Sequence, residues 1–406
     1  MFQIHNNNIS DEIAYNNGDA GHYLKIAKNI HDFHVYSDNN SIISTENATW
    51  RPPFWPFLLS LFFIFTSNIF YLLLIKVVLE FIIVLGCLFL FKRKSELKTV
   101  HFLPFFLILI EPYYLKYSTT FLSESITSVL IFILTIVFIN LNLKKRYTVF
   151  VPIVSGLILL CHPVSAFFVL SMVTIYLLIN VRHNFKIAVL HGLLFCLIIT
   201  SWTYRNYITF NQGFYLTASQ GATFSKGWNE KVCSQFTNVD GDLADESINL
   251  KYVNKKITAT TTISVLELSH LYREGTLNYI KTLSLKETGQ IALKKLKSNF
   301  NPFPEKPKSG ILETAEIFFR IVYLILFVQL LFRIFNKEKI NFENQRDRVF
   351  MVVFSVLLGQ IVMSIYVYTG FRFNAVYSLV LLFCFLYINT NWLYFQKSKI
   401  KMLRNK

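Results

Sequence analysis

The fold class follows from residues 68–94, which are NIFYLLLIKVVLEFIIVLGCLFLFKRK. Between residues 68 and 91 only Lys76 and Glu80 carry a charge. A helix needs about 20 apolar residues to cross the hydrocarbon core of a bilayer, so this stretch predicts a membrane-spanning helix. The run Lys92-Arg93-Lys94 follows at once. Such a basic cluster is typical of the cytoplasmic end of a span.

The composition of the whole chain extends this prediction. Of its 406 residues, 53% are hydrophobic, 17% are aromatic and only 16% are charged. Soluble domains have about a quarter of their residues charged, so an ordinary cytosolic enzyme is excluded. The net charge of +16 could suggest nucleic acid. The basic residues, however, lie in short clusters between apolar runs, so we expect the bilayer and no nucleic acid as a partner.

Apolar runs of about the length of a span recur along the chain. They predict an all-α polytopic membrane protein with about nine transmembrane helices. The nine runs are residues 68–91, 101–114, 123–142, 147–161, 164–181, 186–203, 313–334, 348–369 and 373–394. A tenth run, residues 54–66, follows Arg51-Pro52-Pro53 and is too short to span. We expect it to be a helix in the outer interface.

The short loops give the orientation. Basic residues concentrate in every second loop and in the C-terminal tail, as expected of cytoplasmic segments. These residues are Lys92, Arg93, Lys94, Lys98, Lys144, Lys145, Arg146, Arg182, Lys186, Arg333, Lys337, Lys339, Arg346, Arg348, Lys397, Lys399, Lys401, Arg404 and Lys406. The other short loops hold only Lys116 and Arg372. We therefore expect a multi-pass protein of the plasma (inner) membrane with a cytoplasmic C-terminus.

Four segments result from this topology. Residues 1–66 form an outer-face first loop with the interfacial helix, and residues 67–203 form a six-span membrane bundle. Residues 204–312 form a long outer loop or small subdomain, and residues 313–406 form a three-span bundle with a basic tail. Since nothing precedes the polar residues 1–50 to carry them outward, we expect Met1 to be an internal methionine and a preceding span to be missing.

Ionisable residues at the outer helix ends are candidates for chemistry, since polar residues in lipid are costly. Asp19 stands four and eight residues before Tyr23 and Ala27, which predicts a short helix with Asp19 in its first turn. Glu124 begins the third span. Both carboxylates have plain structural explanations, as a helix cap for Asp19 and as a match to the helix dipole for Glu124. Arg372, basic on the side poor in positive charge, is expected to have an anionic partner.

The order of several short motifs resembles the GT-C fold glycosyltransferases, in particular the group of protein mannosyltransferases and lipid A aminoarabinose transferases. The likeness covers nearly the whole chain. The motifs are Asp19-xxx-Tyr23-xxx-Ala27, Arg51-Pro52-Pro53-x-x-Pro56, Leu122-Ser123-Glu124, Trp202-xx-Arg205-Asn206-Tyr207-xx-Phe210 and Gly370-Phe371-Arg372-Phe373. The chain departs from the pattern at Ala20, where an acidic residue is usual, and at Asn374, where a proline is usual.

The resemblance implies a GT-C-like bundle whose outer loops form the site. Such a membrane glycosyltransferase moves a hexose or pentose, with inversion, from a polyprenyl-phosphate carrier to a glycan, lipid or protein acceptor on the outer face. By position, Asp19 matches the carboxylate that engages the acceptor, with Asp11 as the alternative, and Glu124 matches the second acidic position. The matches expected near the substrate or its phosphate are Tyr23, Arg51, Arg205, Asn206 and Arg372.

Two further residues remain open between structure and chemistry. Lys76 and Glu80 lie four residues apart in the first span. Either they form a buried ion pair that fixes helix packing, or Lys76 approaches the carrier phosphate from within the bundle. His162, before Pro163, is either part of a turn or a residue that lines the site.

No cofactor is assigned from the sequence, because no cluster of histidines and carboxylates has the spacing of metal ligands. A divalent metal is left open. The alternative functions are a transporter or flippase of lipid-linked saccharide and an O-antigen polymerase or ligase-like enzyme. The absence of internal repeats disfavours a transporter, and the early acidic loop disfavours a polymerase.

Overall fold

The structure is a computed structural model. It describes residues 18–38, 47–95, 99–141, 146–211, 216–235, 246–254, 263–300, 311–338, 340–367 and 371–390. All regular structure in these ranges is helical, and they contain no strand. The all-α prediction is therefore confirmed for the part of the chain that is described.

Five of these helices are long and apolar enough to cross a membrane. They are α5 (Ile69–Lys94), α10 (Ala166–His183), α11 (Phe185–Phe210), α16 (Ile311–Phe335) and α17 (Gln345–Tyr366). Three shorter apolar helices accompany them, namely α8 (Glu124–Ile139), α9 (Phe150–Cys161) and Ser378–Thr390. These helices support a multi-pass membrane protein, whereas the count of nine spans stays a prediction.

The second predicted span, residues 101–114, is not one continuous helix. The chain forms α6 (Thr99–Phe102), the 3-10 helix η2 (Leu103–Ile110) and α7 (Pro112–Ser118). The break falls at Glu111, whose side chain accepts hydrogen bonds from the backbone N–H groups of Tyr113 at 2.8 Å and Tyr114 at 2.6 Å. Because a capping side chain followed by Pro112 starts a new helix, the apolar run is divided there.

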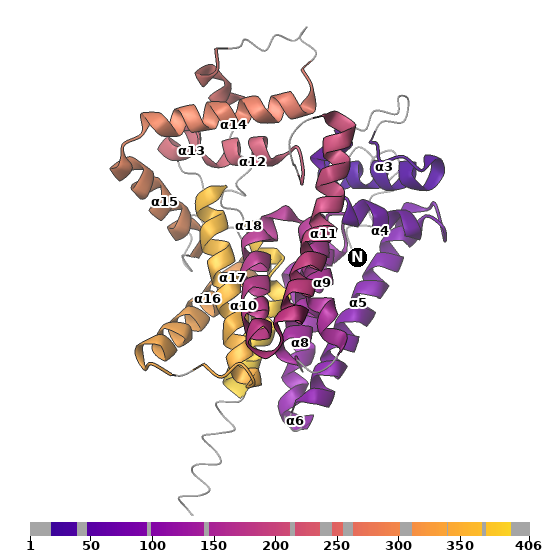
Figure 1. Cartoon of the computed structure of the whole chain (residues 1–406), viewed down its shortest axis with the longest axis vertical. Coiled ribbons are helices and arrows are strands. Elements are labelled where there is room, and N and C mark those ends of the chain that lie inside the picture. The colour runs from indigo at the N-terminus through magenta and orange to yellow at the C-terminus, as the bar shows by residue number, and fades with distance from the viewer. Residues whose placement is uncertain are drawn as a thin grey trace, which may run out of the picture.

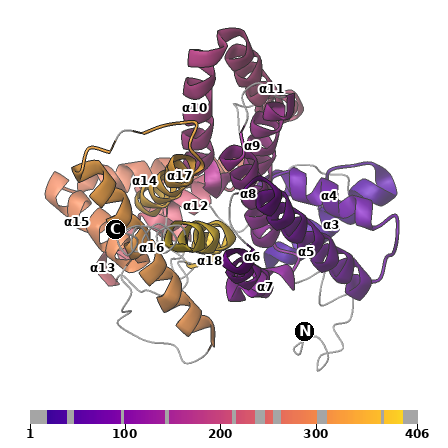
Figure 2. The same cartoon turned by 90° about the horizontal axis from the view of Figure 1, so that it is seen from below.

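Helix α8 lies at the centre of the bundle. It packs against α5, α7, α9, α17 and the short helix α18 (Phe371–Ala375), and a view along the long axis places it among them (Figure 2). Every residue of α8 except Ile133 and Val137 is buried. A helix that is apolar on all sides belongs in such a position. Glu124, at its first residue, therefore stands at the head of the most enclosed helix.

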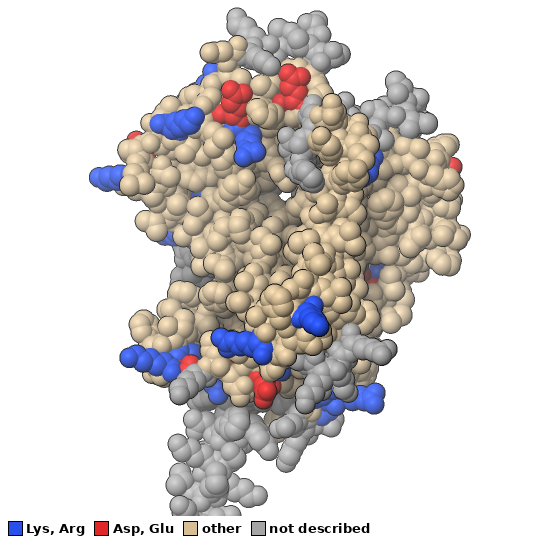
Figure 3. Space-filling model, in the orientation of Figure 1, with Lys and Arg blue, Asp and Glu red and all other residues tan. Residues whose placement is uncertain are grey.

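The two ends of the bundle differ in what they carry (Figure 1). At one end, here called the α3 end, α3 (Gly18–Phe33) and α4 (Phe54–Phe62) lie across the bundle above the first residues of α5 and α8. At the other end, here called the basic end, lie Lys92–Lys94, the α10–α11 turn and the α16–α17 connection. A largely uncharged band separates charged side chains near the two ends (Figure 3).

The long loop contributes further helices at the α3 end. They are α12 (Gln220–Gly227), α13 (Glu230–Gln235), η5 (Glu246–Tyr252), α14 (Val265–Thr282) and α15 (Leu285–Phe300). Gly221 permits the close crossing of α12 and α14, since a Cβ there would lie 1.8 Å from the carbonyl oxygen of Ser269. Residues 265–300 of this loop therefore form two successive helices, α14 and α15.

Candidate functional site

Asp19 and Arg51 form an ion pair at the α3 end. Asp19 lies in the first turn of α3, as the spacing predicts, and Arg51 lies just before α4. The Arg51 guanidinium donates to a carboxylate oxygen of Asp19 at 2.5 Å. The Asp19 side chain is 36% exposed, whereas that of Arg51 is 15% exposed. The pair therefore presents a carboxylate held in place by a more enclosed cation.

Tyr23 connects this pair to α8. Its hydroxyl and that of Ser123 are 3.2 Å apart, and the Arg51 guanidinium lies 5.6 Å from the centre of its ring. Burial raises the pKa of Tyr23 well above its ordinary value, although the positive charge of Arg51 opposes this shift. Tyr23 is therefore a neutral phenol over the physiological pH range, suited to positioning and to hydrogen bonding.

Glu124 follows Ser123 and is completely buried. Its carboxylate interacts electrostatically with Tyr23 and with Lys76. The acidic residue of the third motif therefore lies within reach of the residues of the first motif. Its complete burial distinguishes it from Asp19, whose side chain is 36% exposed.

Lys76 is also buried, with 1% of its side chain exposed. Its ammonium donates to the carbonyl oxygen of Ser118 at 2.9 Å and to the hydroxyl of Ser125 at 2.7 Å. It also forms an ion pair with Glu80 at 3.1 Å, and Ser125 donates to Glu80 at 2.9 Å. These contacts attach the end of α7 and the start of α8 to α5. They favour the structural role of the Lys76–Glu80 pair.

Arg205, near the end of α11, lies among aromatic side chains. Its guanidinium is 5.0 Å from the centre of the Trp202 ring and 5.6 Å from that of Tyr36. It also donates to the side-chain oxygen of the buried Asn206 at 2.8 Å. Tyr36 in turn donates to the carbonyl oxygen of Arg51 at 3.0 Å. The fourth motif is thereby connected to the second through one tyrosine.

The remaining candidates lie differently. His162 directly follows α9 and is buried, with its ring centre 6.2 Å from that of Phe373, so it lies beside α18. Arg372 belongs to α18, although the structure does not describe its side chain. Asp11 lies outside the described residues. The turn expected at His162-Pro163 is present, because α9 stops at Cys161 and a 3-10 turn follows.

Three residues of this region were not predicted from the sequence. Trp55 of α4 donates from its indole N–H to the carbonyl oxygen of Phe121 at 2.7 Å, which fixes α4 beside the start of α8. Tyr36 connects Arg51 with Arg205, and Ser125 connects the start of α8 with Lys76 and Glu80 of α5. An aromatic or hydroxyl side chain gives no signal of such a partner, because the partner lies far along the chain.

No ready metal site is present in the part of the chain that the structure describes. These residues contain no group of three or more histidine, cysteine, aspartate or glutamate side chains that could hold a metal ion. The α3 end provides the partly exposed carboxylate of Asp19, the neutral phenol of Tyr23 and cations that are largely enclosed, such as Arg51. Such groups can accept a proton and stabilise negative charge.

No protein-family model matches the chain, and no curated protein or solved structure was found to be significantly similar to it.

Proposed function

We propose that the chain is a membrane glycosyltransferase that moves a sugar from a polyprenyl-phosphate carrier to an acceptor on the outer face. One observation carries the proposal. Asp19 of the first motif is paired with Arg51 of the second, and Tyr23 contacts Ser123 of the third. Residues spread over more than a hundred positions therefore meet at one end of a membrane bundle.

The chemistry assigned to this site follows from its groups. The acceptor hydroxyl attacks the anomeric carbon and gives its proton to the Asp19 carboxylate. The bond between that carbon and the phosphate oxygen breaks, and polyprenyl phosphate leaves with the electron pair. A carboxylate exposed to the acceptor side suits the base, and Arg51 orients it.

The leaving phosphate needs a cation on the opposite side of the sugar. We assign Arg205 and Arg372 to this role, because a guanidinium binds phosphate in a bidentate manner. Arg205 is partly buried and its guanidinium lies against aromatic rings, so little of its stabilising effect is lost to water. Lys76 is paired with Glu80 and takes a structural role, whereas the buried Glu124 acts on both Tyr23 and Lys76 through its charge.

The experiment is a transfer assay in membranes that contain the chain. Polyprenyl-phosphate donors carrying different radiolabelled sugars are supplied one at a time, with a nucleotide sugar as the control donor. The proposal predicts label on an acceptor and free polyprenyl phosphate with at least one lipid donor. Movement of an intact lipid-linked sugar across the membrane without cleavage would instead support the transporter.

A further inference from the structure

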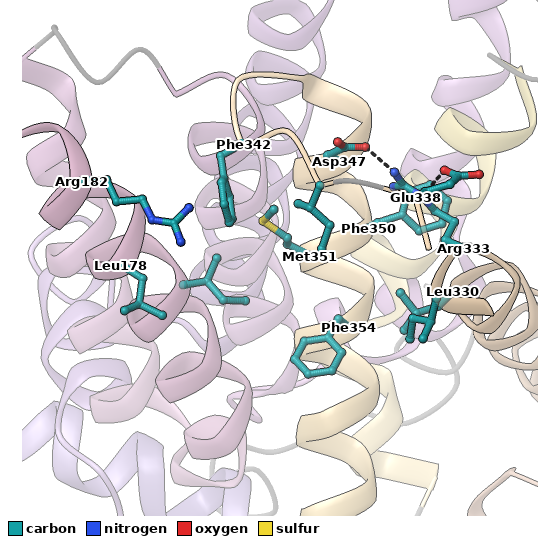
Figure 4. A pocket seen from close by; sticks show the side chains of 13 residues that line it. Leu178, Arg182, Leu330, Arg333, Glu338, Phe342, Asp347, Phe350, Met351 and Phe354 are labelled. Atoms are coloured by element: carbon teal, nitrogen blue, oxygen red, sulfur yellow. Dashed lines mark hydrogen bonds and ion pairs between the residues drawn. The ribbon is translucent and has the colours of Figure 1, made fainter. Parts of the chain in front are cut away.

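A hollow opens at the basic end, between α10, α16 and α17. Its volume is 420 Å³, within the usual range for ligand pockets. Most of its wall is apolar (Figure 4). The apolar lining includes Leu178 of α10, Leu330 of α16 and Phe354 of α17. Leu178 is 61% exposed and Phe354 is 43% exposed, so the hollow opens to the surface along its length.

The charged groups at the two sides of the hollow differ. On the α16 side, Arg333 donates to Glu338 at 2.8 Å and to Asp347 at 2.7 Å, so two carboxylates compensate its charge. On the α10 side, Arg182 points toward the hollow, and its guanidinium lies 5.5 Å from the ring centre of Phe342 (Figure 4). Within the described ranges, no carboxylate forms an ion pair with Arg182.

This pattern points to an occupant with an anionic head and an apolar body. Arg182 lies in the last turn of α10, where a long basic side chain reaches the headgroup region while its helix stays in the hydrocarbon. The apolar wall runs from Arg182 along α10 toward Leu178 and Ile175, away from the basic end. A polar protein segment would leave its backbone groups without partners against such a wall.

We propose that this pocket binds a glycerophospholipid of the surrounding bilayer. Its phosphate contacts Arg182, and one acyl chain lies along the apolar wall between α10 and α16. The lipid then fills the space between these two helices. The site is separate from the residues assigned to sugar transfer, so it stands or fails independently of that function.

The experiment maps lipid contacts directly. The full chain is placed in vesicles of phosphatidylcholine and phosphatidylglycerol, with a trace of phosphatidylglycerol bearing a photoreactive diazirine on one acyl chain. After irradiation, the labelled peptides are identified by mass spectrometry. We expect labelling concentrated on the pocket-facing residues of α10, α16 and α17. Equal labelling of all lipid-facing helices, or no labelling of the pocket-facing residues, would overturn the proposal.

Variants then test the headgroup and the chain separately. Arg182→Gln should lower pocket labelling about tenfold, the loss expected for one charged hydrogen bond. Lys186→Gln is the matched control, because it removes an exposed positive charge nearby that does not line the pocket and should leave labelling unchanged. Leu178→Trp, at an exposed position, should block the pocket while Arg182 stays in place. Unchanged labelling in both Arg182→Gln and Leu178→Trp would contradict the site.

Discussion

The two ends of the bundle each hold an aspartate in the first turn of a helix, paired with an arginine. Asp19 meets Arg51 at the α3 end, and Asp347 meets Arg333 at the basic end. Asp347 is 5% exposed and also accepts from the backbone N–H of Asn341 at 2.6 Å. Asp19 is 36% exposed. The carboxylate of the same pair of residue types is thus enclosed at the basic end and partly exposed at the α3 end.

We therefore assign the enclosed Asp347–Arg333 pair a structural role and propose a reactive role for the Asp19 carboxylate. A carboxylate that is buried and fixed by two donors holds helices together, whereas one that reaches the surface can accept a proton from a substrate.

The buried Lys76–Glu80 pair at the α3 end should be structural. Lys76→Met leaves the Glu80 carboxylate buried without its cation, and we expect the chain to lose about 3 kcal/mol of stability. Thermal unfolding in detergent would measure this loss. The double variant Lys76→Met with Glu80→Gln should regain most of it. A double variant no more stable than Lys76→Met would show that the loss of stability does not come from the unpaired Glu80 carboxylate.

The Asp347–Arg333 pair should affect stability without affecting chemistry. Asp347→Asn weakens a buried ion pair while Glu338 still compensates Arg333, so a loss of about 2 kcal/mol is expected. Unfolding temperature reports the loss, and sugar transfer per folded molecule should stay at the wild-type rate. A large fall in that rate with an unchanged unfolding temperature would indicate that Asp347, at the basic end, takes part in sugar transfer and would contradict its structural role.

The helices of the long loop should be attached to the bundle by the end of α17. The Trp228 indole donates to the carbonyl oxygens of Ile365 at 2.9 Å and Tyr366 at 3.2 Å, and Lys295 donates to that of Val367 at 2.7 Å. Trp228→Phe keeps an aromatic side chain but loses the indole N–H and its two hydrogen bonds, at a cost of about 1 kcal/mol. Limited proteolysis should then cut the α12–α15 region faster. Unchanged cleavage would indicate that the hydrogen bond of Lys295 to Val367 alone holds these helices to the bundle.

The smallest effect concerns an exposed ion pair. Hydrogen bonds from Lys251 and then Tyr252 hold the pKa of Glu230 below its usual value. A lowered carboxyl pKa adds stability above the ordinary pKa of glutamate, and this stability is lost as the pH falls through the lowered value. Wild type and Glu230→Gln should therefore differ slightly in unfolding temperature at neutral pH and converge in acid. A gap that widens in acid would contradict this sign.

Local features of the α3 end could be predicted from the sequence. The spacing of Asp19, Tyr23 and Ala27 predicts a helix, and α3 has Asp19 in its first turn and the other two residues buried. The short helix after Arg51-Pro52-Pro53, now α4, and the turn at His162 were also predicted. These features depend on neighbours along the chain, so periodicity and capping reveal them.

Contacts between distant segments could not be predicted in this way. Arg348 belongs to a basic loop by sequence, yet it is buried and donates to the carbonyl oxygens of Ile139 and Leu141 at the end of α8. Asn374, where the resembled motif has proline, donates to Asn299 at 2.8 Å, a bond that proline cannot make. Only the packing of α8, α15, α17 and α18 determines these partners.

The proposed function requires the partly exposed Asp19 carboxylate as the base in sugar transfer. The most direct measurement compares transfer from polyprenyl-phosphate donors by wild type and Asp19→Asn, in membranes holding equal amounts of folded chain. Asparagine keeps the shape of the side chain but cannot take the acceptor proton, so the rate should fall by about 10³-fold. Transfer at the wild-type rate by Asp19→Asn would contradict the role of Asp19 as the base.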